Sequence, residues 1–350
     1  MTLAPRDGRR LKIAVVKLSS LGDVIHALPV ARALRRAYPA AHLTWIVEAR
    51  EYAILRDHPD LDVVMPVDTR LWRRMIWRPS GARQVWGKLV RLDRRVRASR
   101  FDVALDLQGL IKSGILTAYT GARLRIGFGP GRAGEWPNCL FTNRHVTPPR
   151  EAVHVVDQYL ALLKPLGVEP ATPEFHVPQR PAAERRMEDF LGEQGCKREE
   201  LLVALNPGAS RDNKRWPVSH MRALAERLGA EPDVRILLLW GPDEIHMARQ
   251  IRDGLSTRPI LAPPTDLDEL SALLRRSALL IANDTGPLHL AAALGTPCLG
   301  LYGPTRAERN GPYGARCRGL QSPDGTMAGL DPAVVFDAAL PHLAGREAIP

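Results

Sequence analysis

Short apolar runs alternate with helical patterns along most of the chain, and this alternation constrains the fold more than any other feature. The runs are typical of buried strands, because they are rich in Val, Ile, Leu and Ala and are bounded by turn residues. Strands that alternate with helices form parallel sheets covered by helices on both faces. The sequence therefore predicts an α/β fold of doubly wound, Rossmann-like sheets, with strands at Lys12–Leu18, His42–Glu48, Val63–Val67, Phe101–Leu107, Arg123–Phe128, Leu201–Leu205, Val234–Trp240, Pro259–Ala262, Leu279–Ala282 and Cys298–Tyr302.

The 350 residues divide into two similar halves. Five predicted strands precede a Pro-rich stretch without periodicity, Val168–Pro181, and five follow it. We therefore predict an N-terminal domain at residues 1–170 and a C-terminal domain at residues 171–330. Two such domains would place a ligand cleft between the carboxyl ends of their sheets. The segment 331–350 contains a last helical pattern, which we expect to pack back on the N-terminal domain.

Composition is that of a soluble globular protein, with 45% apolar and 25% charged residues. No run approaches the ~20 apolar residues that a membrane span needs. The polar N-terminus, MTLAPRDGRR, lacks the apolar core of a signal peptide, so we expect the protein to stay in the cytoplasm. The cysteines show no C-x-x-C spacing, and we expect neither a zinc site nor disulfides from Cys139, Cys196, Cys298 and Cys317.

Positive charge is concentrated in one segment of a chain whose formal net charge is +11. Between Arg70 and Arg100 the sequence holds eleven Arg or Lys residues and one acid, Asp93. Three explanations fit: a solvated helical face, a nucleic-acid patch, or a surface for an anionic substrate or membrane headgroups. Composition alone favours the solvated face, because charge runs usually serve solubility.

Two turns in the second half follow strands and offer polar groups to a ligand. The turn at residues 206–217 contains the hydroxyl of Ser210 and the cation of Lys214, which can meet a diphosphate. A surface loop with an incidental lysine explains this turn equally well. The turn at residues 241–244 ends in Glu244, which can accept hydrogen bonds from a ribose or simply complement a helix start.

A third turn, residues 283–289, closes a strand and opens a helix. Asp284 or Thr285 suits the helix cap, and the N–H groups of Thr285 and Gly286 would point at an anion. His289 lies one turn further along the same helix. A nucleotide diphosphate fits such a site. Capping explains Asp284 and Thr285 without a ligand, but it does not explain the histidine.

In the first half, the stretch KLSSLGDVIHALP at residues 17–29 places Asp23 where a helix begins. A carboxylate there repels phosphate, but across a cleft from a diphosphate it is suited to take a proton from an attacking hydroxyl. An acid that complements the helix dipole is an equally good explanation. His26, three residues on, is more typical of a packed histidine. The sequence contains no P-loop, no G-x-G-x-x-G after a first strand and no G-x-S-x-G, which disfavours kinases, dehydrogenases and serine hydrolases.

Taken together, these motifs resemble those of the bacterial heptosyltransferases of glycosyltransferase family 9. The resemblance runs from Lys12 to about Tyr313. It is carried by KLSSLGDVIHALP at 17–29, DLQGLIKS at 106–113, RDNKRWP at 211–217, NDTGPLHLAAALGTP at 283–297 and LYGPT at 301–305.

The resemblance implies a GT-B fold and inverting, metal-independent transfer of a heptosyl group from ADP-L-glycero-D-manno-heptose to Kdo of Kdo-lipid A, without a cofactor. It implies that Asp23 is the catalytic base and that Lys214 meets the departing diphosphate. Donor binding falls to Ser210, Lys214, Glu244, Asp284, Thr285, Gly286 and His289, and acceptor binding to Arg70, Arg73, Arg74 and Lys112.

An acceptor embedded in the inner face of the cytoplasmic membrane changes the interpretation of the basic segment. A cationic surface there would serve acceptor recognition and peripheral membrane contact, and no nucleic acid is expected as a partner. Two alternatives stay open: another family 9 transferase with a different acceptor or nucleotide sugar, and a non-catalytic protein that binds nucleotides or nucleic acid.

Overall fold

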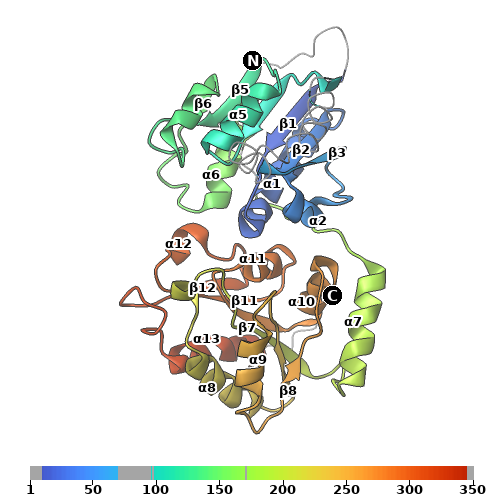
Figure 1. Ribbon diagram of the computed structural model, residues 1–350, viewed down its shortest axis with the longest axis vertical. Coiled ribbons are helices and arrows are strands. Elements are labelled where there is room, and N and C mark those ends of the chain that lie inside the picture. The colour runs from blue at the N-terminus through green and yellow to red at the C-terminus, as the bar shows by residue number, and fades with distance from the viewer. Residues whose placement is uncertain (1–9, 70–95, 97, 170–171, 345–350) are drawn as a thin grey trace, which may run out of the picture. The chain divides into compact units, whose positions relative to one another are not determined.

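The computed structural model describes residues 10–69, 96, 98–169 and 172–344. Its contacts divide the chain into an N-terminal unit, Met1–Pro178, and a C-terminal unit, Gln179–Pro350. The division falls eight residues beyond the predicted boundary at residue 170, inside the Pro-rich stretch. Each unit is an α/β layer structure with one sheet (Figure 1).

The N-terminal unit contains a six-stranded sheet in the order β3-β2-β1-β4-β5-β6. All neighbouring strands are parallel. The chain order reverses between β1 and β4, whose carboxyl ends form the switch point where ligands of such sheets usually bind. The strands are β1 (Lys12–Val16), β2 (His42–Glu48), β3 (Val63–Val67), β4 (Val103–Asp106), β5 (Leu124–Phe128) and β6 (Arg144–Val146).

Five of these strands coincide with predicted ones, and the sixth was not predicted. The first strand, β1, has the burial expected of a parallel strand covered on both faces: Ile13 to Val16 are fully buried. β6 has only three residues, of which two are exposed, so it lacks the apolar run that identifies a buried strand. It still pairs in register with β5, as Gly127 lies opposite His145.

The helices of the N-terminal unit follow the strands as the alternation predicts. The longest helix that the structure describes in this unit, α1, packs against α6, and both lie beside the sheet (Figure 1). The helical segments are α1 (Leu21–Ala37), η2 (Ala49–Glu51), α2 (Tyr52–Leu55), α5 (Ile111–Tyr119), η4 (Trp136–Leu140), α6 (Val155–Ala161) and η5 (Lys164–Leu166).

The C-terminal unit repeats the architecture with a second parallel sheet, in the order β12-β11-β10-β7-β8-β9. Its switch point lies between β10 and β7. β12 was not predicted, because its sequence, CRGLQ, contains Arg318, Gly319 and Gln321 and therefore no apolar run, and the strand lies at the sheet edge. The strands are β7 (Leu201–Asn206), β8 (Val234–Leu238), β9 (Ile260–Leu261), β10 (Leu279–Asn283), β11 (Cys298–Tyr302) and β12 (Cys317–Gln321).

The helices of this unit include one whose packing differs from our expectation. α13 buries Val335, Phe336 and Ala339 in the core of the C-terminal unit and packs against α8 (Figure 1). Its apolar face therefore completes the core of its own unit, where we had expected packing on the N-terminal domain. The helices are α7 (Pro181–Glu193), η6 (Asp212–Lys214), α8 (Val218–Gly229), α9 (Ile245–Arg252), α10 (Leu267–Arg276), α11 (Gly286–Ala293), α12 (Ala307–Asn310) and α13 (Pro332–Ala344).

No helix among the described residues is long and apolar enough to cross a lipid bilayer.

Candidate active site

The turn after β10 has the geometry of an anion-binding helix start. Thr285, with φ −144° and ψ 167°, is the N-cap of α11, and Gly286 is the first helical residue. The amides of a first helical turn have no partner within the helix, and the helix dipole adds positive potential there. The predicted helix start is thus confirmed, with Thr285 rather than Asp284 as the cap residue.

Asp284 is instead the centre of a polar cluster. Its carboxylate accepts hydrogen bonds from Lys214 Nζ at 2.6 Å and Thr305 Oγ1 at 2.9 Å, and it lies 3.3 Å from His289 Nε2. Burial alone would raise the pKa of Asp284, but the hydrogen bonds from His289 and Lys214 outweigh it and lower the pKa to about 2. A permanently charged carboxylate therefore holds three side chains beside the start of α11.

Lys214 reaches this cluster from η6, in the turn after β7. Its side chain is 19% exposed, so the ammonium group is partly desolvated but still accessible. Ser210, in the same turn, is exposed. The structure thus brings Lys214, Asp284, Thr285 and His289 together, whereas Ser210 has no contact that assigns it to the cluster.

Two buried asparagines, which we did not predict as site residues, fix these turns. Asn283 donates to the carbonyl oxygen of Pro207 at 2.8 Å and accepts from the backbone N–H of Trp216 at 3.2 Å. Asn206 donates to Thr285 Oγ1 at 3.3 Å. The sequence signal was an asparagine at the end of each of two apolar strands, LLVALN and LLIAN, which are neighbours in the sheet.

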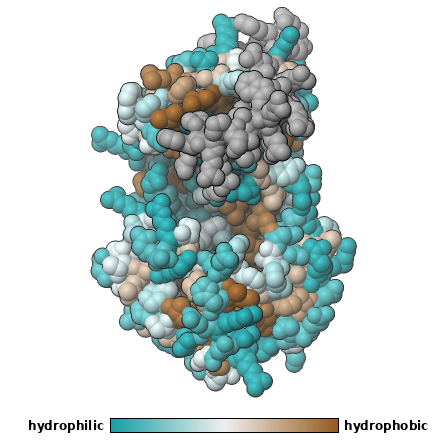
Figure 2. All heavy atoms as spheres, viewed as in Figure 1, coloured by the Kyte–Doolittle hydropathy of each residue, from teal (hydrophilic) through white to brown (hydrophobic). Residues whose placement is uncertain are grey.

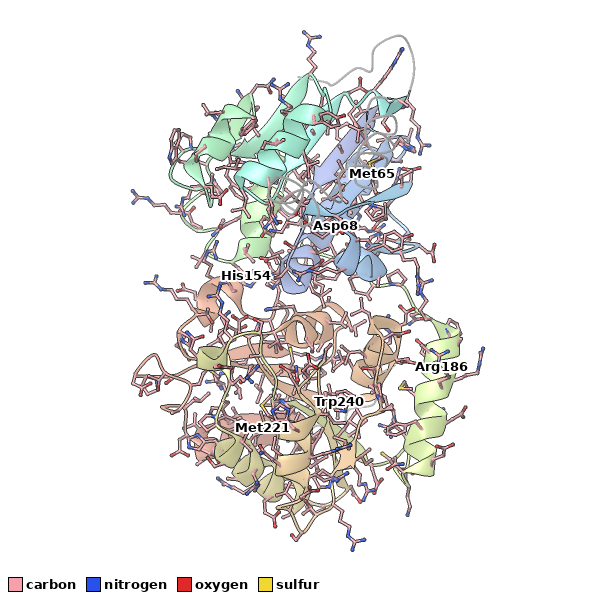
Figure 3. All side chains as sticks on the ribbon, in the orientation of Figure 1. Met65, Asp68, His154, Arg186, Met221 and Trp240 are labelled. Carbon is pink, nitrogen blue, oxygen red and sulfur yellow. The ribbon has the colours of Figure 1, made fainter. Side chains whose placement is uncertain are left out.

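Glu244 lies between the turns that follow β7 and β8. Its carboxylate accepts a hydrogen bond from the Gly241 N–H at 3.1 Å and lies against Gly208 so closely that a Cβ there would be 1.9 Å from Oε2. Trp240, which leads into this turn, donates through its indole Nε1 to the Ala262 carbonyl at 2.7 Å (Figure 3). Glu244 is therefore held at the carboxyl edge of the sheet, and glycine at 208 gives it room.

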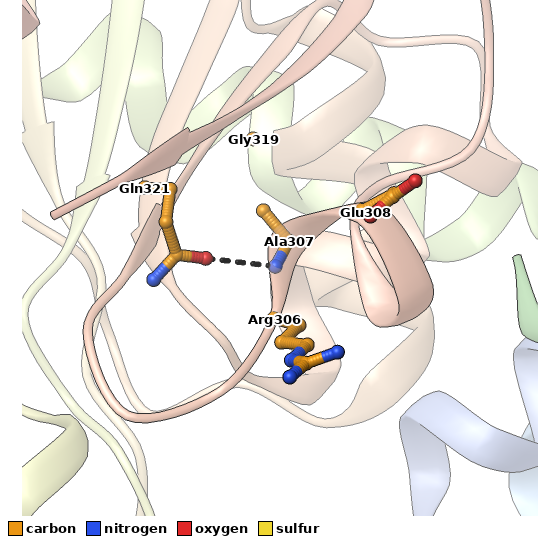
Figure 4. A pocket seen from close by; sticks show the side chains of 5 residues that line it. All are labelled: Arg306, Ala307, Glu308, Gly319 and Gln321. Atoms are coloured by element: carbon orange, nitrogen blue, oxygen red, sulfur yellow. Dashed lines mark hydrogen bonds between the residues drawn. The ribbon is translucent and has the colours of Figure 1, made fainter. Parts of the chain in front are cut away.

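A surface pocket of about 660 Å³ lies at the start of α12. It is lined by Arg306, Ala307, Glu308, Gly319 and Gln321, and the Gln321 amide oxygen accepts from the Ala307 N–H at 3.0 Å (Figure 4). Its lining includes none of the predicted site residues that the structure describes. None of the described side chains that contact Asp284 lines this pocket, although Arg306 directly follows Thr305.

In the N-terminal unit, Asp23 completes a capping box at the start of α1. One oxygen, Oδ2, accepts hydrogen bonds from the Ser20 backbone N–H at 3.0 Å and from Ser20 Oγ at 2.9 Å. The other oxygen, Oδ1, lies 3.9 Å from Lys17 Nζ, and the side chain is 43% exposed. Asp23 thus does stabilise the start of a helix, as one of the two explanations from the sequence states. It leaves the carboxylate accessible, with one oxygen outside the cap.

Lys17 is a buried cation that sequence reasoning did not identify as a site residue. Its side chain is 2% exposed, and Nζ donates to Tyr159 Oη at 2.7 Å and to the Leu107 carbonyl at 3.4 Å. A buried ammonium group is costly unless it is paired, and Asp23 is the carboxylate nearest to it in the ion pairs described. The only signal in the sequence was a lysine directly after an apolar strand.

The motif DLQGLIKS supports the loop that leads to Asp23. Gln108 Oε1 accepts hydrogen bonds from the backbone N–H groups of Leu18 at 3.1 Å and Ser19 at 3.2 Å. Asp106 is fully buried, and burial raises its pKa although Asn138 Nδ2 donates to it at 2.6 Å. This motif therefore positions backbone at the switch point of the sheet.

The remaining predicted residues are only partly described. Lys112, at the start of α5, is 39% exposed, and its Nζ lies 4.0 Å from Glu48 Oε1. His26 is buried with its ring edge-on to His154 at 5.4 Å, which fits the packed role; His154 lies at the start of α6 (Figure 3). The predicted acceptor residues Arg70, Arg73 and Arg74 lie outside the described residues.

The fold and these side chains define a class of protein. Two doubly wound units, one carrying an accessible carboxylate at its switch point and the other a cation beside a free helix start, have the components of a GT-B transferase that uses a nucleotide-linked donor.

Comparison with known proteins identifies the family. The model of glycosyltransferase family 9 (heptosyltransferase) matches residues 89–337. The chain is similar to lipopolysaccharide heptosyltransferase 1 of Salmonella typhimurium, with 31% identity over 93% of this chain and 99% of the relative. The chain therefore belongs to glycosyltransferase family 9 and is a heptosyltransferase.

Solved structures agree in fold. The E. coli heptosyltransferase WaaC with ADP aligns with a TM-score of 0.79 at 26% identity, over 95% of this chain and 100% of that one. The same enzyme with ADP-2-deoxy-2-fluoro heptose aligns with a TM-score of 0.76 at 26% identity, over 95% of this chain and 99% of that one. The predicted GT-B class is confirmed.

Proposed function

We propose that this enzyme transfers a heptosyl group from ADP-L-glycero-D-manno-heptose to Kdo of Kdo-lipid A, in the synthesis of the lipopolysaccharide inner core. The observation that carries the proposal is the cluster of Lys214, Asp284 and His289 at the start of α11, in a chain similar to a lipopolysaccharide heptosyltransferase 1. The structure of a relative with an ADP-heptose analogue supports the donor.

The C-terminal unit would hold the donor. Lys214 and the N–H groups of Thr285 and Gly286 supply positive charge to the diphosphate as the sugar leaves, which favours the transition state. His289, held by Asp284, lies within the same turn and adds a donor. Because these groups can balance the diphosphate charge, we propose that transfer needs no metal ion and no cofactor. Glu244 accepts hydrogen bonds from the nucleoside, and Ser210 contributes its hydroxyl from the turn after β7.

The N-terminal unit would supply the base. Asp23 takes the proton from the acceptor hydroxyl, whose oxygen then forms the new bond to the anomeric carbon of the heptose. The bond from this carbon to the diphosphate oxygen breaks, and ADP leaves with the electron pair. Attack on the face opposite ADP inverts the anomeric configuration. The buried ammonium group of Lys17, 3.9 Å from Asp23, helps to hold the carboxylate in place.

The acceptor would bind through cationic side chains. Kdo-lipid A carries carboxylate and phosphate groups, which suit Lys112 and the predicted acceptor residues Arg70, Arg73 and Arg74. The basic segment that contains these arginines would also attract the anionic inner face of the cytoplasmic membrane, at about 1 kcal/mol for each basic group near the surface. The enzyme would then work as a peripheral protein of the cytoplasmic leaflet, and nucleic acid is not a partner.

The test is ADP release from ADP-heptose with and without Kdo-lipid A, in the presence of EDTA. We expect release that depends on the acceptor and resists EDTA. Lys214→Met should lower the rate by about 10²-fold or more, since it removes charge that stabilises the leaving group. Arg211→Met is the matched control, because Arg211 is an exposed cation of the same turn.

Three outcomes would contradict the proposal. Release abolished by EDTA would refute metal independence, and donor binding without release would mean a different acceptor. Release with a later inner-core acceptor but not with Kdo-lipid A would favour another family 9 transferase, so a panel of core acceptors belongs in the same assay.

A further inference from the structure

The N-terminal unit exposes a group of large apolar side chains that its fold does not require. On α5, Ile111, Ile115 and Tyr119 are 38%, 48% and 38% exposed. They are spaced four residues apart, so they lie along one face of the helix. On η4, Trp136 and Leu140 are 70% and 73% exposed, the most exposed large apolar residues described. We call these five residues the apolar patch.

The two segments of the apolar patch are packed together. A Cβ on Gly114 of α5 would lie 2.8 Å from Asn138 Nδ2 and 2.8 Å from Phe141 Cδ2, so the glycine lets η4 approach closely. Asn138 Nδ2 also donates to the Leu110 carbonyl at 2.8 Å, directly before α5. Figure 2 shows apolar atoms gathered over the region of α5, at the upper left of the view. The apolar patch therefore lies on two helical segments that pack against each other, and not on a loop tip.

Exposed apolar surface of this kind usually marks an interaction site. The residue types point to a lipid surface: tryptophan and tyrosine are enriched where membrane meets water, and leucine and isoleucine favour insertion into the acyl region. The α5 sequence, IKSGILTAY, contains one lysine and no acid. A helix with an exposed apolar face and cationic charge lies readily in the plane of an anionic bilayer.

The charges around the apolar patch complement anionic lipid. Residues 109–150 hold six Lys or Arg residues and one acid, Glu135. Of the cations, Arg132 lies in the turn just before η4 and Arg144 in β6, and both are exposed. Basic groups near an anionic leaflet attract it, whereas a second copy of this chain would bring like charges together.

We propose that the apolar patch inserts into the headgroup region of an anionic bilayer and docks the N-terminal unit on the membrane. The inference rests on the proposed function, because it makes a lipid-borne acceptor the substrate. It assigns membrane contact to residues other than the basic segment that begins at Arg70.

The position of the apolar patch suits such an acceptor. α5 begins just after the carboxyl end of β4, three residues after Gln108, which holds the backbone of Leu18 and Ser19 ahead of Asp23. From there the nine residues of α5 extend about 13 Å along the unit. An acceptor whose lipid part lies in the bilayer at α5 would thus keep its sugar near the switch point that carries Asp23.

The test is sedimentation of the full chain with vesicles of phosphatidylethanolamine and phosphatidylglycerol at a 3:1 ratio. The variant Ile115→Ser/Leu140→Ser removes two apolar side chains, and we expect its vesicle partition coefficient to fall about tenfold to a hundredfold. Val334→Ser is the matched control, since Val334 is an apolar residue of α13 that is 52% exposed. It should bind as the wild type does. All three substitutions are at exposed positions, and thermal unfolding checks that the variants fold.

A parallel assay separates this inference from the proposed function. With a soluble, deacylated Kdo acceptor, the double variant should release ADP at the wild-type rate. Equal vesicle binding by wild type, control and double variant would overturn the inference even if transfer occurs. So would a concentration-dependent dimer that the double variant abolishes without loss of vesicle binding. Patch-dependent vesicle binding without transfer to any Kdo acceptor would sustain the membrane surface and refute the proposed function alone.

Discussion

The observed role of Asp23 as a helix cap and its proposed role as a catalytic base make different predictions for two substitutions. Asp23→Ala removes the oxygen that accepts from the Ser20 N–H and Oγ. We expect a loss of about 1 kcal/mol in the free energy of unfolding of the N-terminal unit, which lowers Tm by roughly 2–4 °C. Asp23→Asn keeps an acceptor oxygen at the same place, so its stability should stay close to that of the wild type.

Turnover should not distinguish these two variants. Neither alanine nor asparagine can take a proton at pH 7, and loss of a general base lowers turnover by about 10²–10⁴-fold. The assay is ADP release at saturating donor, with ADP affinity measured separately by calorimetry. The affinity for ADP should be unchanged, because the residues proposed to bind the diphosphate belong to the C-terminal unit. Ser20→Ala is the control, since it removes one hydrogen bond to the carboxylate and no base. If Asp23→Asn turns over like the wild type, the carboxylate is only a cap and the mechanism is wrong.

Further predictions concern Asp284, Gly208 and a buried histidine. Asp284→Asn should lower the free energy of unfolding by about 2 kcal/mol at pH 7, because the pKa of the Asp284 carboxyl, about 2, lies below the usual 3.8. Measured by urea unfolding, the difference between the variant and the wild type should shrink as the pH falls below about 4. Gly208→Ala should displace the Glu244 carboxylate and weaken ADP binding with little change in Tm, and unchanged ADP affinity would argue against a nucleoside role. Burial lowers the pKa of His58 from 6.5 to about 4, so the folded state resists protonation. Stability should therefore fall by about 3 kcal/mol as pH drops from about 6.5 towards 4, and His58→Asn should flatten this dependence.

The central strands could be predicted from the sequence because parallel strands covered on both faces need apolar runs. β1 and β10 are such strands, with residues buried almost throughout. Two of the four edge strands, β3 and β9, were also predicted, because they keep apolar residues. The other two, β6 and β12, could not be, since an edge strand has fewer covered positions and theirs contain polar residues. They are strands because they pair with a neighbouring strand, and the sequence pattern does not indicate this pairing.

The residues of the candidate site likewise include some that the sequence identified and some that it did not. The positions of Asp23, Lys214 and the start of α11 in turns or helix starts after strands were predictable, because a strand end, a turn and a charged residue occur together there. Lys17 and Thr305 were not, because their roles depend on partners far along the chain: Tyr159 for Lys17 and Asp284 for Thr305. The sequence pattern indicates whether a residue lies in a strand, a turn or a helix start, but not which distant group its side chain contacts.

The cluster around Asp284 indicates how the proposed donor site would balance affinity against orientation. The carboxylate stays charged at neutral pH and binds the ammonium group of Lys214 at 2.6 Å, so an incoming diphosphate would have to compete for that cation. This competition would lower ground-state affinity, but the ion pair fixes Lys214 beside the start of α11 before a donor binds. Only interactions that strengthen in the transition state accelerate transfer. The negative charge on the leaving diphosphate grows in the transition state, so a cation that is already oriented towards it increases the rate more than a cation that binds the ground-state donor tightly.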